Sequence, residues 1–157
     1  MMIKRFQEWL TSASGLRRIL NIYGPYIGAG VKVEYLAKDF REARVSMKLR
    51  WYNRNYVGTH FGGSLFSMID PFYMLLVMNN LGRDYIVWDA EASIKFVSPG
   101  RGVVKAQFVI TDEMLADIKA NTANGEKYLP TYEVMIKDEQ DNLVAKVEKR
   151  LYIRRKG

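Results

Sequence analysis

The sequence predicts an α+β protein in which one antiparallel sheet of five to six strands wraps around a long central helix. Three observations carry this prediction. Much of the chain alternates polar and apolar residues, residues 65–81 form an apolar segment of helical length, and the order of elements is a helix, two strands, a helix and four strands. The chain has 157 residues and is 48% hydrophobic, as expected for one folded domain. We expect residues 1–157 to form this domain, with an N-terminal helix over residues 1–24 and a core over residues 30–155.

The first 24 residues place apolar side chains at spacings of three and four, a pattern typical of an amphipathic helix. We expect this helix to pack on its own domain; the alternatives are a helix on an anionic membrane surface and an organelle presequence. Glycines and a proline between residues 24 and 30 then end the helical periodicity. Two-residue alternation begins after them and predicts strands over residues 31–38 and 43–51.

The apolar segment over residues 65–81 is predicted to be the central helix, with Gly82 as its C-terminal cap. It is apolar on nearly every side, which indicates burial within the sheet. Asp70 and Pro71 interrupt it, so the segment is a poor candidate for a membrane span. The later elements are a strand over residues 86–96, a turn at Ser98-Pro99-Gly100, strands over residues 104–110, 132–136 and 143–153, and a short helix and loop over residues 112–125.

Charge and composition limit the chemistry. The formal net charge of +7 favours anionic partners such as phosphorylated cofactors, nucleic acid or acidic lipid. The absence of cysteine excludes disulfides, thiolate zinc sites, iron–sulfur ligation and cysteine nucleophiles, and it fits a reducing compartment. His60 is the only histidine, so a histidine-rich metal site is excluded. We expect a cytoplasmic protein with no bound metal and no cofactor.

One local motif stands out within this pattern. Residues 55–70 read NYVGTHFGGSLFSMID, and Ser98-Pro99-Gly100 follows the next strand. The motif resembles that of the hotdog-fold acyl-CoA thioesterases, most closely the phenylacetyl-CoA thioesterase-like branch and its relatives of unassigned function. The resemblance implies a hotdog fold, hydrolysis of acyl-CoA to a free acid and coenzyme A, and a site at the interface of a homodimer or a dimer of dimers.

The usual pattern of that branch is an asparagine, a loop, His-Gly-Gly, and an acid eight residues after the first glycine. Asn55 matches the asparagine, the pair Gly62-Gly63 matches the glycines, and Asp70 stands at the position of the acid. The sequence departs from the pattern at one place. Phe61 occupies the histidine position, and His60 lies one residue earlier.

The same residues suggest a chemistry without reference to the family. Backbone N–H groups of Gly62 and Gly63 at a helix N-terminus can stabilise an oxyanion, because glycine lets a carbonyl approach the backbone closely. Asp70 can act as a general base for water or as a nucleophile. The alternative is that Asp70-Pro71 caps and starts a helix, and that the two glycines form a turn without a ligand.

The roles of the neighbouring polar residues are open. His60 can donate a hydrogen bond to the acyl carbonyl or to a phosphate, or it can be a cap or a surface residue. Asn55 can hold the loop or position a water molecule. Arg101 is a candidate contact for the phosphates of coenzyme A, and a solvated surface charge is the alternative.

The remaining candidates concern the substrate and a second copy of the chain. Phe61 and Phe66 are candidate substrate contacts, and the acyl chain is expected to run along Phe66, Phe72, Tyr73 and Met74. Strict alternation predicts that Asp89, Glu91 and Ser93 share one face of their strand, and the resemblance implies that Asp89 reaches the site of a partner chain. The strand over residues 86–96 is long and apolar, so we expect two chains to pair along it.

Three functions follow as alternatives. We favour hydrolysis of acyl-CoA thioesters. The second is a hotdog protein that binds acyl groups or acyl-CoA without catalysis. The third, a nucleic-acid or membrane-surface module, would use the N-terminal helix together with the basic cluster Lys149, Arg150, Arg154, Arg155 and Lys156. The aromatic residues are not interleaved with this cluster, so we expect no nucleic-acid partner and no stable membrane insertion.

Overall fold

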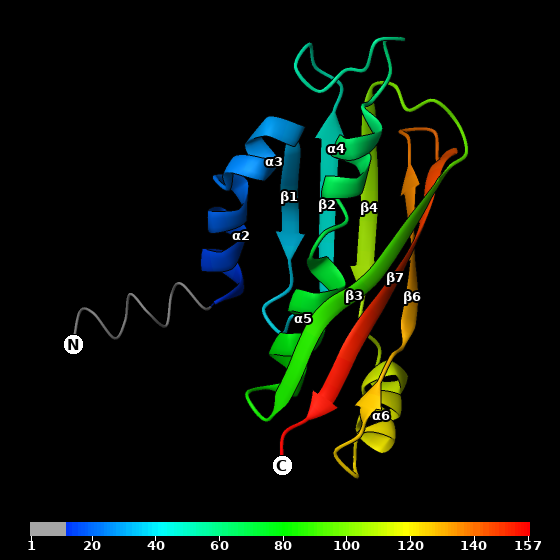
Figure 1. Ribbon diagram of the computed structural model, residues 1–157. Coiled ribbons are helices and arrows are strands. Elements are labelled where there is room, and N and C mark those ends of the chain that lie inside the picture. The colour runs from blue at the N-terminus through cyan, green and yellow to red at the C-terminus, as the bar shows by residue number, and fades with distance from the viewer. Residues whose placement is uncertain (1–11) are drawn as a thin grey trace, which may run out of the picture.

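The computed structural model describes residues 12–157, in which a strongly curved antiparallel sheet lies against the central helical segments (Figure 1). The order of the strands across the sheet is β1-β2-β4-β6-β7-β3, and the short strand β5 pairs with β7. This is the α+β architecture that the sequence predicts. The bounds of the seven strands are β1 Val31–Leu36, β2 Glu42–Lys48, β3 Tyr85–Phe96, β4 Val103–Val109, β5 Lys127–Tyr128, β6 Thr131–Lys137 and β7 Leu143–Arg155.

The sheet has seven strands where five to six were expected, because the two-residue strand β5 is too short to leave a periodic signal. The sheet is also uneven. Strands β4 and β6 share only two registered pairs, Lys105 with Lys137 and Ala106 with Ile136, whereas the pairs on either side of this junction are longer. The sheet therefore consists of a three-stranded part, β1-β2-β4, and a four-stranded part, β6-β7-β3 with β5, and a narrow seam lies between them.

The central helix is present, and it is divided into α4, Gly62–Ser67, and α5, Phe72–Leu81. The division falls at Asp70 and Pro71, which are joined by a cis peptide bond. Pro71 has no N–H to continue the hydrogen bonds of α4, and its carbonyl accepts the N–H of Leu75 at the start of α5. Asp70 is therefore placed in the break between two helices.

The N-terminal helical region covers the edge strand β1. Helix α2, Ala13–Asn21, and the short helix α3, Gly24–Ala29, precede that strand. The side chain of Asn21 accepts the N–H of Val33 at 2.8 Å and donates to its carbonyl at 3.0 Å, so it replaces a neighbouring strand. The expected N-terminal helix is thus present over Ala13–Asn21 and contacts β1 of its own domain, whereas residues 1–11 of the expected range 1–24 lie outside the described residues.

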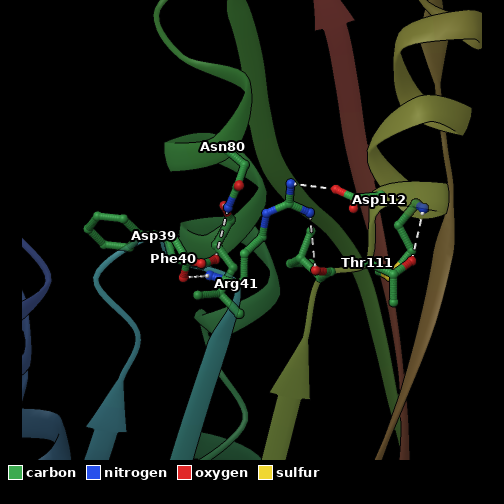
Figure 2. Close-up of polar contacts among 9 residues, drawn as sticks. Asp39, Phe40, Arg41, Asn80, Thr111 and Asp112 are labelled. Atoms are coloured by element: carbon green, nitrogen blue, oxygen red, sulfur yellow. Dashed lines mark hydrogen bonds and ion pairs between the residues drawn. The ribbon is translucent and has the colours of Figure 1, made fainter.

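Side chains join the turn between β1 and β2 to the helices α5 and α6, Asp112–Asn121 (Figure 2). Arg41 donates to the Asp112 carboxylate at 2.8 Å and to the Ile110 carbonyl at 3.3 Å. Asp112 begins helix α6, and Asn80 of α5 donates to the Phe40 carbonyl at 2.9 Å. These contacts hold α5 in place beyond the break at Asp70.

The core beneath the seam is aromatic. Phe108 of β4 is fully buried, and its ring lies 4.9 Å from that of Phe72 and 5.3 Å from that of Tyr73. The Tyr73 ring also packs on that of Tyr132 of β6, at 5.2 Å, and its hydroxyl donates to the Glu133 carbonyl at 2.9 Å. Side chains of α5 therefore join the two parts of the sheet where few strand hydrogen bonds do.

Strand β3 corrects one expectation. Its register with β7 shifts between Asp89 and Glu91, which indicates a β-bulge at Ala90. The bulge reverses the alternation, so Asp89 lies on the inner face while Glu91 and Ser93 are exposed. The prediction that these three residues share one face was wrong, because an extra residue in one strand interrupts the two-residue period.

Candidate active site

Asp70 is held at the helix break by two distant elements. The hydroxyl of Tyr26, a buried residue of α3, donates to the Asp70 carbonyl. The Asp70 carboxylate accepts a hydrogen bond from Lys149 Nζ at 2.7 Å, and the Asp70 side chain stays 51% exposed. The residue that caps α5 is Pro71, without a side-chain cap hydrogen bond. The interpretation of Asp70 as a helix cap is therefore not supported, since its carboxylate is directed to β7.

Lys149 is the residue that the sequence analysis placed in the basic surface cluster, and the structure places it inside the protein. Its side chain is only 2% exposed, and Nζ lies 2.7 Å from Asp70 Oδ1 and 3.0 Å from Asp89 Oδ1. Val147 and Leu151, two residues before and after it on β7, are fully buried. The two-residue spacing from Val147 through Lys149 to Leu151 indicated this burial in the sequence, because every second residue of a strand faces the same side of the sheet.

Asp89 completes the charged cluster from the bulge of β3. Its side chain is 22% exposed and forms an ion pair with Lys149. Burial raises the pKa of Asp89, and the neighbouring negative charge of Asp70 raises it further, while the ammonium of Lys149 opposes both effects. Two carboxylates from separate segments therefore share one buried ammonium, a cluster with a formal charge of −1 when both are ionised.

Aromatic rings lie where the side chains of the two glycines at the start of α4 would be. A Cβ atom added at Gly62 would lie 2.9 Å from the ring of Phe96, and one at Gly63 would lie 2.4 Å from the ring of Phe61. Within residues 12–157, neither glycine N–H has a hydrogen-bond acceptor. Only glycine fits beneath these rings as they stand, and both N–H groups remain free to donate.

Asn55 and His60 shape the loop before α4. The Asn55 side chain accepts the N–H of Thr59 at 2.9 Å and donates to the Thr59 hydroxyl at 2.8 Å. His60 is buried, with Nε2 lying 3.2 Å from the Gly102 carbonyl, and burial lowers the pKa of its imidazole. No hydrogen bond in the described part of the chain joins His60 or Asn55 to Asp70.

The other candidate residues are less closely placed. Phe66 is half-buried on α4, and Arg101 is exposed in the turn before β4. Arg150, next to Lys149 in the basic cluster, is exposed and paired with Glu91 at 2.8 Å. The cluster is thus divided between two faces of β7. In residues 12–157, no helix is both long enough and apolar enough to cross a membrane.

Sheet and central helix together define a hotdog-fold protein, and solved hotdog structures match nearly the whole chain. The chain belongs to the family described as "Domain of unknown function (DUF4442)", whose model matches residues 13–153. Among curated proteins, none matches the sequence.

Three solved structures illustrate the similarity. A protein of unknown function from Pseudomonas aeruginosa, described as a probable thioesterase, has a TM-score of 0.78 and 20% identity over 89% of this chain and 94% of that chain. A Haemophilus influenzae thioesterase has a TM-score of 0.66 and 11% identity, covering 92% of this chain and 91% of that chain. The E. coli PaaI protein from the phenylacetic acid degradation operon has a TM-score of 0.58 and 15% identity, covering 90% and 91%. The expected resemblance in fold is confirmed.

Proposed function

We propose that this protein hydrolyses acyl-CoA thioesters to a free acid and coenzyme A, with Asp70 as the reacting carboxylate. The observation that carries the proposal is the half-exposed Asp70 carboxylate, held by a buried ammonium at a break in an otherwise apolar helix. Burying the Lys149 ammonium is costly, and such a charge is commonly retained for a reaction. The thioesterase descriptions of the fold relatives agree with this chemistry.

The proposed reaction needs water and the substrate alone. With Asp70 as base, the water oxygen bonds to the thioester carbonyl carbon and its proton passes to the carboxylate. Collapse of the oxyanion breaks the carbon–sulfur bond, and the thiolate of coenzyme A takes up the proton. With Asp70 as nucleophile, its oxygen bonds to the carbonyl carbon, the carbon–sulfur bond breaks, and the coenzyme A thiolate leaves an anhydride behind. Water then hydrolyses the anhydride, which frees the acid and the Asp70 carboxylate, and one proton of that water goes to the thiolate. In both routes the free N–H groups of Gly62 and Gly63 are the donors for the oxyanion.

The proposal includes a homodimer. Strand β3 is an edge strand with no neighbour on one side within residues 12–157, and Trp88 and Phe96 on it are about half exposed. Pairing of two β3 strands would complete the hydrogen bonding of this edge and cover these aromatic rings. Arg101 remains the proposed contact for the coenzyme A phosphates, and Phe66 the proposed contact for the acyl chain.

A second candidate, binding of acyl-CoA without hydrolysis, is favoured by one observation. Phe61 replaces the histidine of the resembling enzymes, and its ring lies against Gly63, while that of Phe96 lies against Gly62. The apolar Phe61 ring cannot donate a hydrogen bond to a substrate carbonyl as a histidine could. Without that donor, the acyl group could bind without reacting.

The test is release of coenzyme A from short, medium, long and aromatic acyl-CoAs by the wild type, Asp70→Asn and Asp84→Asn. Asp84 is an exposed loop residue and serves as the matched control. Loss of a reacting carboxylate should lower turnover by about 100-fold or more in Asp70→Asn and leave Asp84→Asn unchanged. Wild-type protein that binds acyl-CoA in a calorimeter but releases no coenzyme A would refute hydrolysis and establish the binding function.

A further inference from the structure

Three segments that are far apart in the sequence meet at one buried nitrogen. Asp70 comes from the break between α4 and α5, Asp89 from the bulge of β3, and Lys149 from β7. The Lys149 ammonium is almost inaccessible to solvent, and it lies 2.7 Å from one carboxylate and 3.0 Å from the other. A lysine in such a position is strongly destabilising unless its charge is compensated, so this arrangement is specific to the two acids.

The other ionisable groups near the cluster, among the described residues, are two tyrosines and one exposed ion pair. Tyr132 of β6 is the cross-strand neighbour of Lys149, and its hydroxyl is buried without a partner in the part of the chain that the structure describes. Tyr26 of α3 donates to the Asp70 carbonyl. Burial raises the pKa of both phenols, so they are neutral across the physiological range. Glu91 and Arg150 form their own exposed ion pair.

This inference rests on the proposed hydrolase function. We propose that Lys149 is a positioning residue, which directs the Asp70 carboxylate from the helix break toward the reacting carbonyl through an ammonium that Asp70 shares with Asp89. Two neighbouring carboxylates tend to share one proton, and a protonated Asp70 is neither a base nor a nucleophile. The ammonium between them counteracts this tendency. It also fixes one oxygen of Asp70, since Nζ donates to Oδ1 while half of the side chain stays exposed.

The absence of cysteine from the chain permits a direct test. Lys149→Cys introduces a single thiol, which can be alkylated in the unfolded state before refolding. Bromoethylamine restores an ammonium at nearly the length of lysine, whereas iodoacetamide gives a neutral side chain of similar size. The two products form a matched pair that differs in charge at one position. Lys149→Met is the second neutral variant, for use if the carbamidomethyl form does not refold.

Two readouts distinguish positioning from a merely structural role. The aminoethyl form should regain kcat to within about threefold of the wild type, and the neutral form should lose about tenfold or more in kcat with little change in KM. The acidic limb of the pH profile should move about one pH unit higher in the neutral form, a common effect of one neighbouring charge. Equal kcat and equal pH profiles in the two folded forms would overturn the inference and leave the proposed hydrolysis intact.

Failure of the proposed function would give a different result. If the wild type releases no coenzyme A from any substrate, hydrolysis is refuted, and carboxyl carbon NMR titration then tests the role of Lys149. The Asp89 carboxyl, assigned with Asp89→Asn, should titrate at a higher pH in the neutral form than in the aminoethyl form, because the ammonium at position 149 lowers the pKa of Asp89. Identical titration of Asp89 in the two forms would overturn the inference without reference to catalysis.

Discussion

Replacing Asn53 with aspartate or alanine tests the structure before α4 most sharply. Asn53 is buried, and its side chain donates to the carbonyls of Ala29 at 3.1 Å and Lys48 at 3.0 Å and accepts the N–H of Arg50 at 2.7 Å. Its own carbonyl accepts the N–H of Phe61 at 3.0 Å, so it connects the end of α3 to the start of α4. Three side-chain hydrogen bonds at about 1 kcal/mol each give about 3 kcal/mol for Asn53→Ala.

Asn53→Asp has nearly the same shape but should destabilise the protein more than Asn53→Ala at pH 7. Its second oxygen replaces the amide nitrogen and then faces the carbonyls of Ala29 and Lys48, where two acceptors repel a third. Lowering the pH should narrow the difference, because protonation restores one donor. The stabilising effect of that proton is lost as the pH rises through the raised pKa of the new carboxyl.

Thermal unfolding followed by circular dichroism measures this effect. For a chain of this size, about 3 kcal/mol corresponds to a decrease in Tm of about 10 °C for Asn53→Ala. Asn79→Ala is the control, since Asn79 is exposed and makes one local helix hydrogen bond, and its Tm should change by less than about 2 °C. If Asn53→Asp melts within about 2 °C of the wild type at pH 7, the reasoning about buried donors is refuted.

Two further predictions concern the core and the charged cluster. Phe108→Ala should lower the free energy of unfolding by about 3–5 kcal/mol in urea titrations, because it removes a fully buried ring from the core. Val109→Ala, at the exposed neighbouring position, should lower it by less than about 1 kcal/mol. Equal losses in the two variants would contradict the aromatic core. Because burial raises the pKa of Asp89, the folded chain binds this proton more tightly than the unfolded chain, so the contribution of Asp89 to stability is largest at low pH and falls as the pH rises above about 4. Asp89→Asn should remove this decrease of stability with rising pH, and Glu91→Gln should not. The urea midpoints of the variants at several pH values test this. Parallel pH curves for the wild type and Asp89→Asn would contradict the raised pKa of Asp89.

The sheet was predictable because its strands have one wet face and one dry face. In β2, Ala43, Val45 and Met47 are all fully buried, as their two-residue spacing indicates. The same logic failed at β3, because the bulge at Ala90 is set by pairing with β7 and leaves no mark in the local pattern. The seam between β4 and β6 is a property of tertiary packing and was equally invisible.

The candidate site was only partly predictable. Asp70 was detectable as a carboxylate within an apolar helix, and its break from Pro71 follows from the chemistry of proline. The hydrogen-bond partners of Asp70 were not detectable from the sequence, because Tyr26 lies 44 residues before it and Lys149 lies 79 residues after it. Lys149 was assigned to the solvent because four other cations lie near it in the sequence, although its position in the strand alternation indicated the interior.

The narrow seam between β4 and β6 has a consequence for motion. Hydrogen exchange occurs through local opening, and opening is easiest where few hydrogen bonds must break together. The two registered pairs of this seam, with the Tyr73 hydroxyl on Glu133, are the weakest junction across the strand order of the sheet. Amide exchange at the facing edges of β4 and β6 should therefore be faster than in the long β3–β7 ladder. We therefore expect the three-stranded part and the four-stranded part of the sheet to separate first along this seam, beneath Tyr73, while each part keeps its own hydrogen bonds.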